Sequence, residues 1–206
     1  MRVLILSFYY PPDLSAGSFR TAALVQALKG LNIPDLQIDV LTTQPNRYAD
    51  AALSAAEEEH NDNLYIRRFL IPSHKSAMKD QARTFASFSR QVWAHTRGKK
   101  WDLVFATSSR LMTAMLGALI ARRQNTPLYL DIRDLFSDTM GDVLKHSRLK
   151  YALPIIERLE KWTFRQASKI NVVSEGFVPH IRKIAARTAH STFTNGIDPM
   201  FLRFDF

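Results

Sequence analysis

Short apolar segments alternate with helix-like segments along this chain. The short segments are rich in β-branched residues and have the length of buried parallel strands. They cover residues 3–8, 37–42, 64–70, 103–107, 128–132, 170–173 and 191–194. Apolar residues recur at helical spacing between them, at 18–29, 77–96, 111–123, 153–167 and 177–185. This alternation predicts an α/β fold with a Rossmann-like, doubly wound, mostly parallel sheet and helices on both faces.

The loop PPDLSAGSFR, residues 11–20, joins the first predicted strand to a helix that carries Arg20 in its first turns. Ligands of such sheets bind beyond the carboxyl ends of the strands. A helix N-terminus also offers unpaired N–H groups and a positive dipole end, which suit a phosphate. The loop therefore indicates an anion site. The alternative is that Gly17 merely allows a turn that any such domain needs.

A second polar loop contains Asp131, Arg133 and Asp134 at the end of the fifth predicted strand. A carboxylate at a strand end can accept a proton from a substrate hydroxyl, and the arginine can orient or tune it. The alternative is an internal ion pair between Arg133 and Asp134 that caps the next helix. Polar loops also follow the last two strands, at 174–176 and 195–198.

Several classes of enzyme lack their usual motifs in this sequence. No GxGxxG or GxxxxGK[ST] pattern is present, which argues against dinucleotide and P-loop chemistry. The six histidines never have HxxxH or HExxH spacing, there is no cysteine, and no GxSxG elbow follows a strand. We therefore expect no metal, no cofactor and no serine or thiol nucleophile.

Length and charge further narrow the possible domain count, location and partners. A chain of 206 residues suits one domain, and no run is apolar enough for a membrane span or a signal peptide, so we expect a cytoplasmic protein. Its 28 basic and 19 acidic residues leave a net charge of +9, which attracts polyanions. No nucleic-acid-binding module surrounds the basic groups, so we expect no nucleic acid partner.

Residues 71–101 favour a second kind of anionic partner. Met78, Ala82, Phe85, Val92 and Trp93 can share a helical face, with seven lysines and arginines nearby. Such a basic amphipathic helix can lie on an anionic membrane. The alternative is that the apolar stripe packs on the sheet as an ordinary crossover helix.

Several segments, in their order along the chain, resemble the N-terminal domain of family-4 glycosyltransferases with the GT-B fold. They are LILSFYYPPDLSAGSFRTAALVQALKG, WDLVFATSSRLMTAMLGALIARR, PLYLDIRDLFSD, ERLEKWTFRQASKINVVSEG and FTNGIDPMF. The resemblance runs from residue 1 to about residue 201, and is greatest to the branch that builds bacterial surface polysaccharides such as O-antigen and capsule, including lipopolysaccharide.

This resemblance implies a retaining, metal-independent transfer of a sugar from a nucleotide-sugar to a saccharide on a polyprenyl diphosphate carrier. It assigns substrate binding to Gly17, Arg20, Ser174, Glu175, Asn195 and Gly196. It assigns the chemistry to Asp131, Arg133 and Asp134, with Asp131 the first choice to position or deprotonate the acceptor hydroxyl. Two departures are Ser15-Ala16-Gly17 in place of a glycine run, and Phe136-Ser137 in place of Trp-Pro.

The resemblance also implies a second domain. The family continues with a nucleotide-sugar domain that holds most of the donor, whereas eight residues follow Asp198 here. We therefore expect residues 1–206 to be the acceptor-side domain alone, inactive by itself, with its parent peripheral on the inner membrane face. The competing hypothesis is a noncatalytic, basic Rossmann-like module that binds nucleic acid or phosphorylated ligands.

Overall fold

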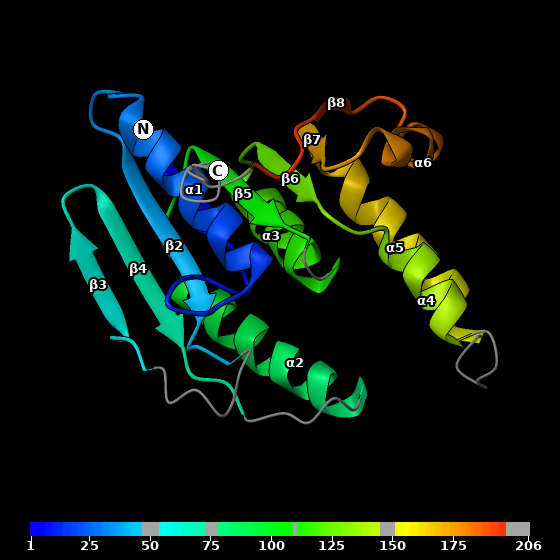
Figure 1. Ribbon diagram of the computed structural model, residues 1–206, viewed down its shortest axis with the longest axis horizontal. Coiled ribbons are helices and arrows are strands. Elements are labelled where there is room, and N and C mark those ends of the chain that lie inside the picture. Colours follow the sequence, from blue (N-terminus) through cyan, green and yellow to red (C-terminus); the bar gives the residue numbers. More distant parts are fainter. Residues whose placement is uncertain (47–53, 73–77, 109–110, 145–150, 197–206) are drawn as a thin grey trace, which may run out of the picture.

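A twisted sheet with the strand order β3-β4-β2-β1-β5-β6-β7-β8 forms the centre of the computed structural model, which describes residues 1–46, 54–72, 78–108, 111–144 and 151–196 (Figure 1). All neighbouring strands are parallel except β3, which pairs antiparallel with β4. The strands are β1 (Arg2–Leu6), β2 (Gln37–Thr43), β3 (Glu58–Asn61), β4 (Leu64–Phe69), β5 (Leu103–Thr107), β6 (Leu128–Ile132), β7 (Lys169–Val172) and β8 (Ala189–Thr192).

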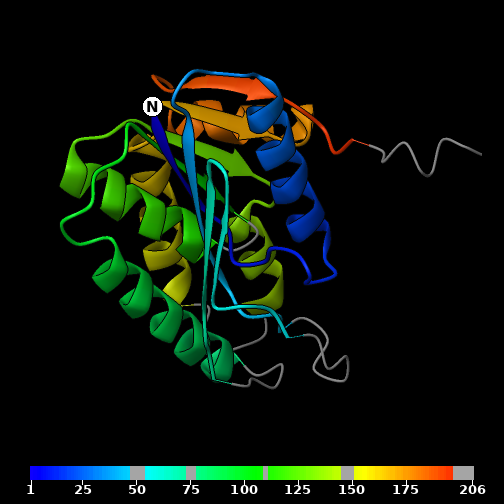
Figure 2. The same ribbon diagram turned by 90° about the vertical axis from the view of Figure 1, so that its left-hand side faces the viewer.

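Helices cover both faces of the sheet, as Figure 2 shows with the strands nearly edge-on. They are α1 (Ala16–Gly30), α2 (Met78–His95), α3 (Leu111–Gln124), α4 (Phe136–Leu144), α5 (Leu153–Arg165) and α6 (Val178–Ile184), with a 3₁₀ turn η2 (Glu175–Phe177) before α6. α1 packs on one face, and α2, α3, α5 and α6 pack on the other. The predicted Rossmann-like, mostly parallel α/β fold is confirmed.

The central strand β1 has both faces buried because apolar residues occupy every position after Arg2. Leu4 and Leu6 join the larger core under α2, α3 and α5, while Val3 and Ile5 join the smaller core under α1. A strand that is buried on both sides reads as a continuous apolar run rather than an alternating one. β1 also lies between β2 and β5. The strands β2 to β4 extend the sheet on one side of β1, and the strands β5 to β8 extend it on the other. That switch point is where open α/β sheets bind ligands.

The apolar stripe of α2 packs on the sheet. Phe85, Phe88 and Val92 are buried in the larger core, and Trp93 is partly buried against it. Ala82 is exposed, and the side chain of Met78 lies outside the described set. This arrangement supports the crossover-helix alternative, because the apolar side chains that a membrane would bury are already buried against the protein.

Close packing between α3 and β5 depends on a glycine. A Cβ at Gly117 would lie 2.7 Å from the Cβ of Ala106 and 3.5 Å from a methyl carbon of Leu128. Real Cβ atoms do not approach at 2.7 Å, so the helix sits nearer the sheet than any larger residue would allow. This contact fixes α3 behind the strands that end at the candidate site.

Two elements were absent from the predicted order. The edge strand β3 has the sequence EEHN, without an apolar residue, and its Glu58 and Glu59 form ion pairs with Arg67 and Arg68 of β4. Charges of this kind are common on edge strands, where they discourage pairing with other chains. The helix α4 follows directly after the acidic loop. The remaining strands and helices lie within about two residues of their predicted positions.

Candidate functional site

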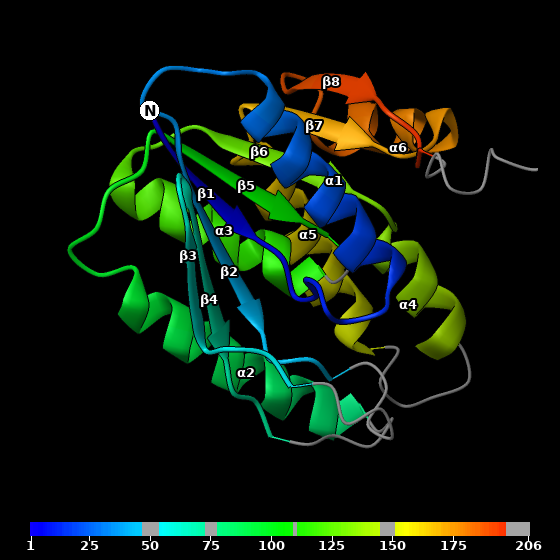
Figure 3. The same cartoon turned by 60° about the vertical axis from the view of Figure 1, so that its left-hand side comes forward.

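α1 begins at the carboxyl edge of the sheet, beside the ends of β1 and β5 (Figure 3). Ser15 caps it, because the backbone N–H of Ser18 donates to the Ser15 hydroxyl over 3.2 Å. The chain turns before this point, where the N–H of Asp13 donates to the carbonyl of Tyr10 over 3.0 Å. Gly17 therefore belongs to the first turn of α1 rather than to the loop that precedes it.

Arg20 extends from α1 to the end of β6 and pairs with Asp131. Its Nε donates to Oδ2 over 2.7 Å and its Nη2 donates to Oδ1 over 2.8 Å, which is the two-point geometry of a strong guanidinium–carboxylate pair. The side chains are 20% and 4% exposed. The hydrogen bond to Asp131 raises the pKa of Arg20 above its ordinary value, although burial acts in the opposite direction. Arg20 is therefore a fixed positive charge at this edge.

Asn171 of β7 completes the surroundings of Asp131. Its Nδ2 donates to Oδ1 of Asp131 over 2.7 Å, and its own Oδ1 accepts from the backbone N–H of Phe193 over 2.9 Å. Arg20 donates to the carbonyls of Phe193 and Thr194 over 3.1 and 3.0 Å. This cluster therefore ties α1, β6 and β7 to the segment that follows β8.

Asn195 and Gly196 lie in that exposed segment. The side-chain oxygen of Asn195 accepts from Nη1 of Arg20 over 3.3 Å, so this predicted site residue joins the cluster. No hydrogen bond from Gly196 to the rest of the described chain is seen. Residues 197 and 198, which complete the predicted loop, lie outside the described residues.

Arg133 is held against the start of α1. Its Nη1 donates to the carbonyl of Ala16 over 3.0 Å, and its backbone N–H donates to the hydroxyl of Ser108 over 3.1 Å. Burial lowers the pKa of Arg133, and the nearby positive charge of Arg20 adds to this effect, whereas Asp131 and Asp134 oppose it. Arg133 and the N-terminus of α1 therefore place positive charge together, which favours an anion, whereas the charge of Arg20 is balanced by Asp131.

Asp134 has a different environment from Asp131. Asp134 is exposed, and within the described chain no hydrogen bond or ion pair holds its carboxylate. The predicted alternative of an Arg133–Asp134 ion pair is not seen, because Arg133 donates to Ala16 instead. The two carboxylates of the acidic loop thus differ in accessibility: one is buried and fully engaged, and the other is open to a substrate.

Ser174 and Glu175 follow β7 at the same edge of the sheet. The Ser174 hydroxyl accepts from the N–H of Gly176 over 3.3 Å and caps the turn η2. Both residues are exposed. No hydrogen bond within the described ranges links them to the Arg20–Asp131 pair.

Sequence reasoning missed two members of this site. Asn171 lies inside the apolar strand KINV, and Ser108 follows β5. Both are buried and both orient residues of the predicted acidic loop. A polar residue inside an otherwise apolar strand was the available signal for Asn171, because a buried amide must find hydrogen-bond partners.

Two absences among the described residues bear on function. No group of three or more histidine, aspartate or glutamate side chains is arranged to hold a metal ion there. Among the helices described, none has the length and apolar character needed to cross a membrane.

A protein-family profile described as "Glycosyl transferase 4-like domain" matches residues 17–195. The matched region begins at Gly17 and ends at Asn195, so it includes the whole Arg20–Asp131 cluster. No curated protein sequence matches the chain.

Solved structures share the fold at low sequence identity. Sucrose-phosphate synthase from Thermosynechococcus elongatus is 12% identical with a TM-score of 0.58, covering 96% of this chain and 90% of that one. UGT89C1 from Arabidopsis thaliana, complexed with quercetin, is 14% identical with a TM-score of 0.59, covering 98% of this chain. The present chain spans about half of the UGT89C1 structure, at 53%. The same plant protein has also been solved with UDP and with UDP-L-rhamnose.

Proposed function

The chain belongs to the glycosyl transferase 4-like family, and from this premise we propose that it is the acceptor-side, N-terminal domain of a retaining, metal-independent glycosyltransferase. The parent enzyme would transfer a sugar from a nucleotide-sugar to a lipid-linked saccharide during the synthesis of a bacterial surface polysaccharide. The GT-B-type α/β fold and the family match support the glycosyltransferase class. The retention of anomeric configuration, the independence of metal, the acceptor and the pathway are part of the proposal.

The observation that carries the proposal is the Arg20–Asp131 ion pair. It draws the start of α1, the end of β6 and the segment 193–195 to one edge of the sheet. In a two-domain enzyme this edge would face the donor domain. The carboxyl edge of the strands, where these three separate segments meet, is the usual location of ligand binding in such sheets.

The positive charge around α1 suits the diphosphate of a nucleotide-sugar donor. Arg133 makes one side-chain hydrogen bond to the described protein, so the rest of its guanidinium can contact a phosphate. The N-terminal turn with Gly17 adds backbone N–H groups beside it. Fixed cations of this kind stabilise the charge that develops on a leaving diphosphate, which is the task that a metal performs in other transferases.

The acidic loop would handle the acceptor hydroxyl. We infer that Asp134 is the carboxylate that contacts this hydroxyl, because it is exposed and unpaired in the described chain. Asp131 would be a positioning residue instead, since Arg20 and Asn171 engage both of its oxygens. Ser174, Glu175, Asn195 and Gly196 remain proposed substrate contacts at the same edge.

A lipid-linked acceptor would bring the enzyme to an anionic membrane. The net charge of +9 supports that partner. Exposed Arg83, Arg90 and Arg97 on and after α2 can contribute through charge, although the apolar stripe of that helix is buried. Membrane contact through α2 would therefore be electrostatic and sensitive to salt.

The test uses the full-length gene product, a panel of nucleotide-sugars and a polyprenyl diphosphate-linked saccharide. We expect transfer that persists in EDTA and a product whose new glycosidic bond keeps the anomeric configuration of the donor, as read by NMR. Loss of activity in EDTA would contradict metal independence, and an inverted product would contradict the retaining mechanism. No transfer from any donor would contradict the proposed function as a whole.

A further inference from the structure

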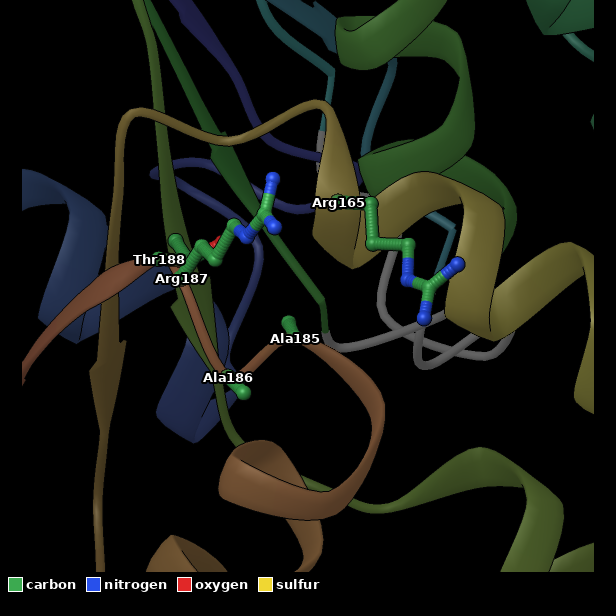
Figure 4. Close-up of a pocket in the computed structure, with 5 residues that line it drawn as sticks. All are labelled: Arg165, Ala185, Ala186, Arg187 and Thr188. Carbon is green, nitrogen blue, oxygen red and sulfur yellow. The ribbon is translucent and has the colours of Figure 1, made fainter.

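Two cavities lie between α5 and α6, and neither is lined by Arg20 or Asp131. One, of about 430 Å³, is lined by residues that include Arg158, Lys161, His180 and Lys183. The other, of about 460 Å³, is lined by Arg165, Ala185, Ala186, Arg187 and Thr188. Figure 4 shows Arg165 on α5 and Arg187 on the segment before β8 flanking this second cavity. We call both cavities together the α5–α6 groove.

The two helices run in the same direction along this groove. Nε2 of His180 lies 3.0 Å from a carboxylate oxygen of Glu160, and Nε of Arg165 donates to the carbonyl of Ile184 over 2.8 Å. These contacts join residues 20 and 19 positions apart, which is the pattern of two parallel helices in register.

Basic residues line both walls of the groove and recur at one spacing in the sequence. Three pairs each join residues 22 positions apart, one from each wall of the groove: Arg158 with His180, Lys161 with Lys183, and Arg165 with Arg187. On α5, the basic residues of this row run from Arg158 to Arg165, seven positions apart. At 1.5 Å per helical residue, the row is roughly 10 Å long.

The positive charge of the groove is not neutralised by the protein. In the described part of the chain, no ion pair joins Arg158, Lys161, Arg165, Lys183 or Arg187 to a carboxylate. Two carboxylates line the groove. Glu157 is exposed, while Glu160 is 1% exposed and engaged with Ser137 and His180. The lining therefore has a clear excess of positive charge.

Buried contacts fix the shape of the groove. Glu160 of α5 accepts from the backbone N–H and the hydroxyl of Ser137, over 3.2 and 2.6 Å, and contacts His180 of α6. The single carboxylate thus ties α5 to the first turn of α4 and to α6. A ligand would meet a preformed site, which avoids the free-energy cost of ordering it.

We propose that the α5–α6 groove binds phosphate groups, at least two at a time, along its row of cations. The guanidinium forks of Arg165 and Arg187 match phosphate oxygens, and the lysines supply point charges beside them. A soluble oligophosphate or the headgroups of an anionic lipid could present these phosphates. The side chains of Ile155 and Leu159 are 63% and 37% exposed on the same helix, and they would contact acyl chains in the lipid case.

A nucleic acid fits the groove less well. Proteins that bind single strands stack the bases on aromatic side chains, and neither cavity is lined by a phenylalanine, tyrosine or tryptophan. The row of three pairs also matches a few phosphates rather than a long strand. The second cavity lies at the opposite edge of the sheet from the site proposed for sugar transfer, since Arg165 ends α5 and Thr188 precedes β8. The first cavity begins at Ser137, in the first turn of α4, and extends from there along α5 and α6.

The test compares two triple variants with equal loss of charge. Lys161→Gln, Lys183→Gln and Arg187→Gln remove groove cations that make no side-chain hydrogen bond in the described chain. Lys29→Gln, Arg122→Gln and Lys169→Gln remove three cations that line neither cavity and lie outside the segment proposed for membrane contact, and they serve as the control. Binding is measured with sodium tripolyphosphate by calorimetry, and by sedimentation with vesicles of phosphatidylglycerol or phosphatidylcholine. Circular dichroism checks that both variants keep the fold.

We expect the groove variant to bind tripolyphosphate or phosphatidylglycerol vesicles about tenfold more weakly, and the control variant to change little. Ile155→Ser with Leu159→Ser then identifies the source: weakened vesicle binding with unchanged tripolyphosphate binding indicates a lipid, and no effect on either indicates a soluble ligand. Equal losses in the two triple variants would overturn the proposal, because net charge alone would explain them. Binding of single-stranded DNA without binding of tripolyphosphate or vesicles would also overturn it.

Discussion

Arg20 and Asp131 stand 111 residues apart in the sequence and form a two-point ion pair at the carboxyl edge of the sheet. The pair is mostly buried, and Asn171 and the carbonyls of Phe193 and Thr194 satisfy its remaining hydrogen-bonding groups. Burying two charges costs free energy unless the geometry and the surrounding hydrogen bonds compensate. In this site the two-point geometry and the surrounding hydrogen bonds supply that compensation. The pair therefore acts as a clamp, which holds the start of α1 against the segment after β8.

Replacing Asp131 with Asn should destabilise the fold, because it leaves the guanidinium of Arg20 buried without a counter-charge. Breaking a buried pair in this way costs roughly 3 kcal/mol or more of unfolding free energy. Urea unfolding followed by circular dichroism measures the change. Asp134→Asn is the matched control, since the same chemical change at an exposed position should cost less than about 0.5 kcal/mol. Equal effects at the two positions would contradict the clamp.

Replacing Asp134 with Asn should reduce sugar transfer by the full-length enzyme while leaving its stability near that of the wild type. Loss of a group that accepts or positions the acceptor hydroxyl costs roughly 10²-fold or more in turnover. The affinity for the nucleotide-sugar should stay unchanged, because Arg133 and the N-terminus of α1 are untouched. Normal turnover in this variant would remove Asp134 from the mechanism.

Gly117→Ala should destabilise the protein, although alanine is the better helix former. The new methyl carbon would lie 2.7 Å from the Cβ of Ala106, so α3 or β5 must shift. Overpacking of a core typically costs about 1–3 kcal/mol. Gly141→Ala in α4 is the control, because a Cβ there would have no described neighbour within 4 Å and should gain up to about 1 kcal/mol from helix propensity. Thermal unfolding of both variants would expose the difference, and equal melting temperatures would argue against the close approach.

His95, the last residue of α2, has an unusual environment for a histidine. Its ring stacks on Tyr65 at 6.1 Å between centroids, and Nζ of Lys99 lies 2.7 Å from its Nε2. Burial lowers the pKa of His95, and the positive charges of Lys99 and Arg67 lower it further, while Glu58 and Asp39 act in the opposite direction. The neutral ring is therefore the form that the fold favours.

This lowered pKa makes stability depend on pH in a defined direction. Above the ordinary histidine value near 6.5, the folded and unfolded states both hold a neutral ring. As the pH falls through that value, the unfolded state binds a proton before the folded state does, so the free energy of unfolding decreases. His95→Gln should make the decrease between pH 7.5 and pH 5.5 shallower, as measured by urea unfolding. The exposed His60→Gln serves as the control, and parallel curves for all three proteins would refute the effect.

The sequence by itself determined the order of the strands and helices apart from β3 and α4. The strands at 103–107 and 128–132 were recognisable because parallel strands buried on both faces read as short apolar runs, a property of local composition. It also predicted that Arg20, Asp131 and Asn195 belong to one ligand-binding edge, because the carboxyl ends of parallel strands meet there. The structure brings these three residues into contact.

Tertiary structure alone decided what each side chain can do. Its place at a strand end made Asp131 the first choice for the chemistry, and only packing shows that Asp131 is buried against Arg20 while Asp134 is exposed. The apolar stripe on α2 has the same helical spacing whether it packs on a sheet or on a membrane. Contact with the core shows that it packs on the sheet. The α5–α6 groove depends on a register between two helices separated by a strand. Such choices arise from contacts between distant segments, which local periodicity does not encode.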